Sequence, residues 1–306
     1  HWEFIKQALL EIRQKLKLQG NQNLVVLQGE TIECFAKLHR QFNLSAVYSH
    51  EETGIDWTYK RDIKVANFFQ KMGIPWHEYS NGGVIRKLKS RDDWKKLQEI
   101  RLIQNCLPEP ETYANSPEYQ NPESILNDFK LPTTNVREIQ KGGRSNGIET
   151  LESFINLRAR NYQKSISKPG LARDSCSRLS PHLSFGTLSI REVFQATWSA
   201  MRNAKQNNDW ALRKNLAAFQ SRLHWHCHFI QKLEGIELVP ATSYPFGDED
   251  MMNHKTGMTT GSSRRLSDSS PSSQLCLLEL LSKINGCDAC PDEMKSTAQM
   301  LNDLAN

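Results

Sequence analysis

The sequence has no apolar run long enough to cross a membrane, and its N-terminus shows no signal-peptide pattern. Its seven cysteines are odd in number and scattered, which argues against a disulfide framework. No methionine opens the chain, which begins at His1. These absences predict an intracellular protein of a reducing compartment (cytoplasm, nucleus or plastid) without a membrane partner. They also predict that further residues precede His1 in the complete protein.

Extremes of composition are missing as well. Charged residues make up 24% of the 306 positions and hydrophobic residues 38%, which is ordinary for a globular protein with a sizeable core. The net charge of +5 is mildly basic. Such a balance permits nucleic-acid binding without requiring it.

The first 104 residues alternate helical and extended segments. Amphipathic periodicity predicts helices at 1–18, 31–42 and 57–71, and short apolar runs predict strands at 24–27, 46–48 and 74–79. The first helix places Phe4, Ile5, Ala8, Leu9, Ile12 and Leu16 on one face. Alternation of this kind predicts a Rossmann-like parallel sheet covered by helices. We therefore expect an α/β domain over 1–104 that is incomplete at its N-terminus.

Three further regions follow along the chain. Residues 105–147 contain five prolines and lose periodicity, so they predict a connector between domains. Helical patterns return at 148–245 and predict a partial all-helical domain, which includes a long helix over 210–234. Residues 246–306 include a Ser-, Thr- and Gly-rich segment and predict a divergent, poorly ordered tail.

The stretch Arg173–Val193 carries the strongest local signal. Ser180 followed by Pro181 predicts a helix N-cap with proline at the first helical position. A helix start with free N–H groups, and Arg178 beside it, suits a phosphate. Ser189-x-x-Glu192 predicts a capping box on a second helix. Read locally, the stretch is also compatible with an ordinary helix–turn–helix corner.

A histidine cluster lies in the long helix. His224 and His228 are four residues apart and share a helical face, which would suit a metal ion. No carboxylate or cysteine at the right offset completes such a site, and the pair Cys287-x-x-Cys290 in the tail stands alone. We expect no metal site.

The sequence of the stretch Arg173–Val193 resembles the flavin-binding signature of the photolyase/cryptochrome family, T-S-R-L-S-P-x-L-x-x-G-x-L-S-x-R. Ten positions match in register: Ser177, Arg178, Leu179, Ser180, Pro181, Leu183, Gly186, Leu188, Ser189 and Arg191. Cys176 stands where threonine is usual. The resemblance covers residues 1–245. It implies an α/β domain followed by an all-α domain that binds FAD.

The same resemblance implies site residues. Those expected to contact FAD are Tyr162, Cys176, Ser177, Arg178, Leu179, Ser180 and Phe219. Those expected to contact DNA are Arg222 and Trp225. Trp225 matches a tryptophan that stacks on a flipped-out base. Arg222 departs from the family, because it replaces a glutamate that accepts a hydrogen bond from the lesion and a guanidinium cannot accept one.

As function, the resemblance implies a deoxyribodipyrimidine photolyase-like lyase. Excited FAD would pass an electron to a pyrimidine lesion in single- or double-stranded DNA, and the protein would act as a monomer. The antenna chromophore is left open. The helical block that supplies the flavin-ring contacts and the electron-transfer tryptophans in the family has no counterpart after Met258, so no catalytic residue is assigned and weak or absent FAD binding is expected.

Two alternatives remain open at this point. The first is a cryptochrome-like blue-light receptor without repair activity, which Arg222 favours. The second is a non-enzymatic nucleotide-binding α/β protein with a helical appendage.

Overall fold

The computed structural model describes residues 1–19, 24–53, 56–88, 90–110 and 139–236. The chain divides into two compact units, residues 1–239 and 240–306. The second unit lies outside the described residues, and so do the predicted tail and most of the predicted connector. The domain boundaries set from the sequence stay predictions.

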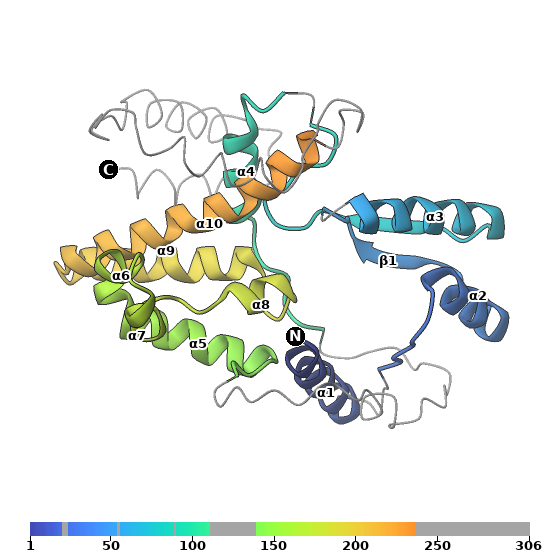
Figure 1. Ribbon diagram of the computed structural model, residues 1–306, viewed down its shortest axis with the longest axis horizontal. Coiled ribbons are helices and arrows are strands. Elements are labelled where there is room, and N and C mark those ends of the chain that lie inside the picture. The colour runs from blue at the N-terminus through green and yellow to red at the C-terminus, as the bar shows by residue number, and fades with distance from the viewer. Residues whose placement is uncertain (20–23, 54–55, 89, 111–138, 237–306) are drawn as a thin grey trace. The chain divides into compact units, whose positions relative to one another are not determined.

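An α/β part is formed by α2 (Thr31–Phe42), β1 (Val47–His50), α3 (Asp56–Met72) and β2 (Trp76–Tyr79). The two strands are parallel, so α3 is the crossover helix between them. Figure 1 shows α3 running beside β1. A small core holds the crossover in place, because Val65 and Phe69 of α3 are buried at 3% and 1% exposure. The α/β fold predicted from the sequence is confirmed.

The predicted strand at 24–27 is wrong. These residues are not in a strand, and Val25 is 37% exposed. In the described part of the chain, the one sheet contains β1 and β2 alone. A four-residue apolar run specifies burial but not a hydrogen-bonding neighbour, and without such a neighbour a strand does not form.

Helix α1 (Trp2–Leu18) buries little of its apolar face. Its buried residues are Phe4 and Arg13, whereas Ile12 from the predicted apolar face is 47% exposed. Phe4 meets the ring of His182 edge-on at 5.0 Å. The helix is thus attached to the helical part of the fold through Phe4.

Polar contacts reinforce this attachment. Gln7 Oε1 accepts a hydrogen bond from the Gly142 N–H at 2.7 Å, and Glu11 Oε1 accepts one from the Ser145 N–H at 2.9 Å. Ser145 lies in the first turn of α5, so Glu11 caps that helix from a distance of 134 residues in sequence. The approach requires glycine at position 142, since a Cβ there would lie 2.0 Å from the Phe4 carbonyl oxygen.

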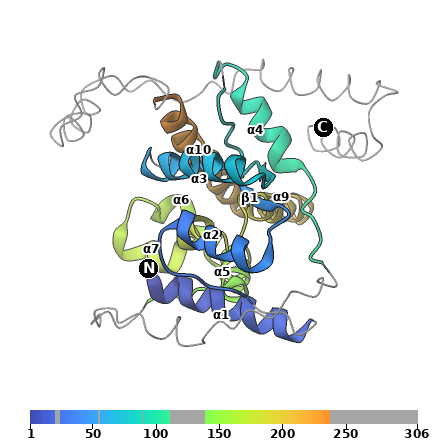
Figure 2. The ribbon, with the colours of Figure 1, turned by 90° about the vertical axis from the view of Figure 1, so that its right-hand side faces the viewer.

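The helical part contains seven α-helices among the described residues, and Figure 2 shows it from the side. They are α4 (Trp94–Ile103), α5 (Arg144–Asn156), α6 (Tyr162–Ser165), α7 (Ala172–Ser175), α8 (Ser180–Ser184), α9 (Ile190–Gln206) and α10 (Trp210–Ile236). Two 3₁₀ turns, Arg158–Asn161 and Pro169–Leu171, lie between α5 and α7. The first helix after the connector therefore starts at residue 144, earlier than the predicted 148.

Helices α9 and α10 form the centre of this part. They lie side by side in Figure 1 and make the most extensive contact between any two described elements. Their interface is apolar, because Val193 of α9 and Leu216 of α10 are both fully buried. Phe154 of α5 joins the same core at 0% exposure.

Two glutamines connect α10 to α4 and to the segment that precedes α4. Gln231 lies on α10, and Gln98 lies on α4. Gln231 is 2% exposed; its Oε1 accepts from the Ile85 N–H at 2.7 Å and its Nε2 donates to the Ile85 carbonyl at 2.9 Å. Gln98 of α4 is fully buried and lies 2.8 Å from His224 Nδ1. Within the described ranges, no helix has the length and apolarity needed to cross a bilayer.

Candidate anion-binding turn

A four-residue turn, Cys176–Leu179, joins α7 to α8 and contains most of the predicted flavin-binding residues. Arg178 adopts a left-handed conformation with φ +61°, and Leu179 follows with φ −89° and ψ −8°. Successive left- and right-handed residues turn neighbouring backbone N–H groups into a concavity that suits an anion. We call this segment the anion turn.

The amides of the anion turn have no hydrogen-bond partner within the described part of the chain. Among the residues that the structure describes, none accepts a hydrogen bond from the N–H of Ser177, Arg178 or Leu179. The three carbonyl groups of the same peptides, in contrast, are all bonded: those of Cys176 and Ser177 to Arg158, and that of Arg178 to Gln140. The carbonyl groups of the turn are therefore hydrogen-bonded to the protein, whereas its N–H groups make no hydrogen bond to the described residues.

The predicted helix start is displaced by one residue. Helix α8 begins at Ser180, its N-cap is Leu179, and no side chain caps it. The reason is the left-handed Arg178, which turns the chain into the helix before Ser180 is reached. The capping box is confirmed: Ser189 Oγ accepts from the Glu192 N–H at 3.1 Å, and Glu192 Oε2 accepts from the Ser189 N–H at 2.9 Å.

An aromatic group lies behind the anion turn. Tyr162 and Phe219 are 5% and 3% exposed, and their rings meet edge-on at 5.7 Å. Both also meet Phe154, at 5.6 Å and 4.7 Å. Leu179 belongs to the same core, so the structure brings three of the predicted flavin residues together. Burial raises the pKa of Tyr162 to about 12, which leaves it a neutral phenol at physiological pH.

The surroundings of the turn are positively charged. Arg158, Arg173 and Arg178 line a shallow pocket of about 300 Å³, and the other described residues that line it are uncharged. Burial, with Arg178 nearby, lowers the pKa of Arg158. Burial raises the pKa of the Cys176 thiol, and the same two arginines oppose that rise.

Sequence reasoning missed Arg158. Its position in the chain looks like one more basic residue on a helical surface, beside Arg160. Its role depends on carbonyl groups 18 and 19 residues further on, and no local pattern records such contacts.

The two predicted DNA-contacting residues lie on α10. The Arg222 guanidinium sits over the Trp225 ring, 4.9 Å from its centroid. Trp225 is 49% exposed and meets the exposed Phe229 edge-on at 5.8 Å. The indole is thus placed on the surface, where a base could stack on it. Its contact with DNA stays a prediction.

The histidines of α10 make contacts of another kind. His224 faces Gln98, and burial, with Lys95 nearby, lowers the pKa of His224 to about 4. His228 Nδ1 lies 3.3 Å from Arg91 Nη2. Within the described residues, no three His, Cys, Asp or Glu side chains gather as metal ligands.

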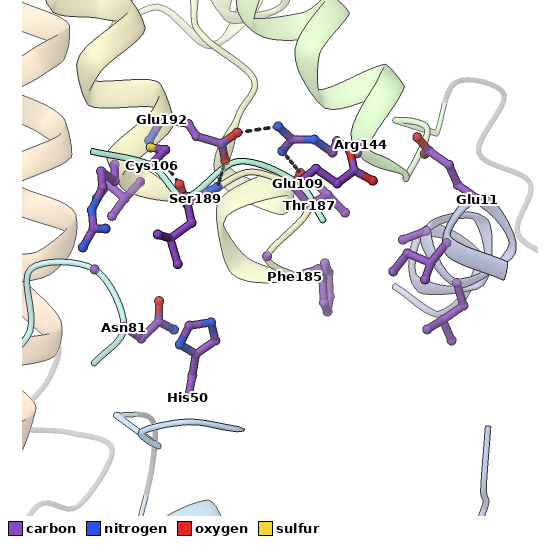
Figure 3. A pocket seen from close by; sticks show the side chains of 18 of the residues that line it. Glu11, His50, Asn81, Cys106, Glu109, Arg144, Phe185, Thr187, Ser189 and Glu192 are labelled. Atoms are coloured by element: carbon purple, nitrogen blue, oxygen red, sulfur yellow. Dashed lines mark hydrogen bonds and ion pairs between the residues drawn. The ribbon is translucent and has the colours of Figure 1, made fainter. Parts of the chain in front are cut away.

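A separate cavity of about 640 Å³ lies between α1 and the corner of α8 and α9 (Figure 3). Its walls include the Arg144–Glu192 ion pair, 2.5 Å long, which Figure 3 shows next to Ser189. The apolar face of α1 lines this cavity through Ile5, Leu9 and Leu16, among others. None of the seven predicted flavin residues is among its lining residues.

Comparison with known proteins agrees with the fold described above and with the family resemblance of the sequence. A model of the DNA photolyase family matches residues 1–92. Deoxyribodipyrimidine photo-lyase of Halobacterium salinarum is 44% identical over 254 residues, which cover 75% of this chain and 49% of that protein. Cryptochrome-2 of Gallus gallus is 20% identical over 234 residues, which cover 68% of this chain and 39% of that protein. The chain spans less than half the length of these two relatives.

One solved structure supports the same fold. A bacterial class III photolyase from Agrobacterium tumefaciens matches with a TM-score of 0.61 at 16% identity, over 83% of this chain and 55% of that one. An archaeal photolyase from Sulfolobus tokodaii, solved with two FAD molecules, matches with a TM-score of 0.45 at 24% identity, over 71% and 49% of the two chains. The fold is that of an α/β part followed by a helical part. The chain belongs to the photolyase and cryptochrome family, as the signature around Arg178 predicted.

Proposed function

We propose that this protein binds FAD with the dinucleotide phosphates on the anion turn, and that its activity is the family's light-driven repair of pyrimidine lesions in DNA, which the poor flavin retention expected for residues 1–306 would impair. The observation that supports the proposal best is the set of amides at Ser177, Arg178 and Leu179 that have no acceptor among the described residues. When bound, the flavin would supply the electron; the protein positions it and excludes water.

Several of the predicted residues have a part in this arrangement. The amides of the turn would donate to phosphate oxygens, and the Arg178 side chain would add positive charge beside them. Tyr162 and Phe219 share the buried core with Leu179 and are 5% and 3% exposed, so they would support the turn from the interior of the protein rather than contact the flavin. The phosphate side of the cofactor is therefore the side that the described residues fit.

The ligand preference tests the proposal. Titration with FAD, ADP and riboflavin, followed by fluorescence and calorimetry, should show that FAD and ADP bind with similar affinity and riboflavin far more weakly. Arg178→Ala should weaken FAD and ADP binding by about tenfold or more, as expected for losing a charge-assisted contact. Ser184→Ala is the matched control, because Ser184 is an exposed serine at the end of the same helix.

Two results would contradict this assignment. One is riboflavin binding as tightly as FAD, since the phosphates would then contribute nothing. The other is Arg178→Ala behaving like Ser184→Ala. Binding of ADP with no preference for any flavin would instead support the non-enzymatic nucleotide-binding alternative.

A cryptochrome-like light receptor without repair activity is the second candidate, and Arg222 favours it. The guanidinium lies over the Trp225 ring, at the position where repair enzymes of the family carry a carboxylate that accepts a hydrogen bond. Blue-light irradiation of FAD-loaded protein with dimer-containing DNA separates the two. Lesion loss supports the repair function, whereas flavin photoreduction without lesion loss supports the receptor.

A further inference from the structure

Arg158 makes an unusual set of contacts for a partly buried arginine. Its Nη1 donates to the Cys176 carbonyl, and its Nη2 donates to the Ser177 carbonyl at 3.3 Å. On its other side, Nη2 donates to the Thr150 carbonyl at 2.7 Å, and both Nη2 and Nε donate to Ser153 Oγ at 3.0 Å and 3.3 Å. Arg158 thus joins the anion turn to the last two turns of α5.

These contacts fix the direction of the amides on the turn. A trans peptide is planar and its carbonyl oxygen and amide hydrogen point in opposite directions. The Cys176 carbonyl shares a peptide with the Ser177 N–H, and the Ser177 carbonyl shares one with the Arg178 N–H. Because Arg158 holds both carbonyls on one side, the two N–H groups must face the other side.

Gln140 extends the same arrangement by one peptide. Its Nε2 donates to the Arg178 carbonyl at 2.5 Å, so the Leu179 N–H is directed away from Gln140. Gln140 and Arg158 line the same shallow pocket, which places both donors on one side of the turn. The three acceptor-free amides described above are therefore the three whose carbonyls these side chains hold.

We propose that Arg158 is a positioning residue: it sets the conformation of the anion turn by holding the Cys176 and Ser177 carbonyls, without touching the ligand. The inference rests on the proposed function, which makes the N–H face of the turn the phosphate side. The planar fork of the guanidinium is essential, because contacts to two carbonyls and to Thr150 and Ser153 need donors in fixed directions. The ammonium of a lysine has the charge but not this geometry.

The reactivity of Cys176 reports the conformation of the turn without any ligand. Cys176, which is partly buried, is the probe. Cys227, which is buried in α10, and Cys106, which is exposed, serve as internal standards in the same protein. We would measure alkylation of each cysteine by iodoacetamide, peptide by peptide, by mass spectrometry. The variant is Arg158→Lys, which retains the charge near the thiol. Arg160→Lys is the matched control, since Arg160 lies in the same 3₁₀ turn and pairs with Asp209.

We expect Arg158→Lys to raise the alkylation rate of Cys176 by about tenfold, as for a local opening that loses hydrogen bonds to a charged group, while Cys227 and Cys106 react at unchanged rates. Arg160→Lys should leave all three rates unchanged. Equal Cys176 rates in the two variants would overturn the proposal. A parallel rise at Cys227 would also overturn it, because Arg158 would then stabilise the whole core.

The same variants tested with ligand keep this inference separate from the proposed function. If the unchanged chain binds FAD, Arg158→Lys should lose about tenfold in affinity for FAD and ADP and nothing for riboflavin. If Arg158→Lys raises the alkylation rate of Cys176 but retains its affinity for FAD and ADP, the positioning role is overturned. If the unchanged chain binds no FAD although Arg158 controls Cys176, the proposed function fails and the structural role of Arg158 stands.

Discussion

Gln231 and the backbone of Ile85 exchange two hydrogen bonds across 146 residues of sequence, at 2.7 Å and 2.9 Å. The side-chain amide takes the place that a neighbouring strand would occupy in a sheet, because it satisfies both the N–H and the carbonyl of one residue. The segment before α4 thus has one of its residues paired with α10 although it forms no strand there.

Removing this pairing should destabilise the fold. We expect Gln231→Leu to lower the free energy of unfolding by about 2–4 kcal/mol, because it leaves both backbone groups of Ile85 without partners near the core. Lys232→Leu changes the exposed neighbour and should cost less than about 0.5 kcal/mol. Urea denaturation compares the two variants, and equal midpoints would show that the pair contributes nothing.

Acidification should destabilise the protein through His224. Its folded pKa of about 4 lies below the value of about 6.5 for an unfolded histidine. The unfolded state therefore binds a proton that the folded state excludes, so this part of the stability is complete above pH 6.5 and is lost as the pH falls toward 4. Burial lowers the pKa of His182 as well, so that residue acts in the same direction.

Unfolding in urea at pH 7.0 and pH 4.5 measures this effect. The midpoint should drop on acidification in the unchanged protein, and the drop should be smaller in His224→Gln. His50→Gln, at an exposed position at the end of β1, should leave the drop as it was. An identical drop in all three proteins would rule out His224 as a cause.

DNA binding should depend on Trp225. If a base stacks on the exposed indole, Trp225→Ala should weaken binding to lesion-containing single-stranded DNA by about 1–3 kcal/mol. Helix α10 contains a matched control, Trp210, which is 55% exposed and has the Arg213 guanidinium 5.7 Å from its ring centroid. Fluorescence anisotropy should show that Trp210→Ala binds as the unchanged protein does. Equal losses in both variants would indicate non-specific contacts.

Residues 1–306 should not be photoreduced efficiently. The described residues fit the phosphate side of FAD, and the sequence after Met258 has no counterpart of the block that covers the flavin ring in the family. We therefore expect substoichiometric flavin after purification and little formation of reduced flavin under blue light. A yellow, stoichiometrically loaded protein that bleaches on irradiation would contradict this prediction.

The elements that the sequence predicted well are those whose signal is local. Helices α2, α3 and α10 follow from amphipathic periodicity, and the capping box at Ser189 and Glu192 needs only four residues. The flavin signature likewise identified the turn around Arg178, because the family resemblance carries tertiary information that the residues alone do not.

The failures share a physical cause, which is dependence on distant partners. The run at 24–27 is apolar enough for a strand but finds no neighbour among the described residues. Ser180 satisfies the sequence preferences of an N-cap, but the left-handed Arg178 starts the helix one residue sooner than that preference implies. Arg158 has no local signature, since its partners become neighbours only when α5 and the anion turn come together.

The capping of α5 by Glu11 limits how chimeras of proteins in this family can be designed. Residues 1–104 look like an exchangeable block when the sequence is divided by its patterns. Yet α1 supplies the carboxylate at the start of α5 and the ring that packs on His182. A chimera joined beyond residue 104 would therefore pair a foreign first helix with a helical part shaped around Glu11 and Phe4. In a chimera, α1 would therefore have to be exchanged together with α5 and α8, although α1 lies far from them in the sequence.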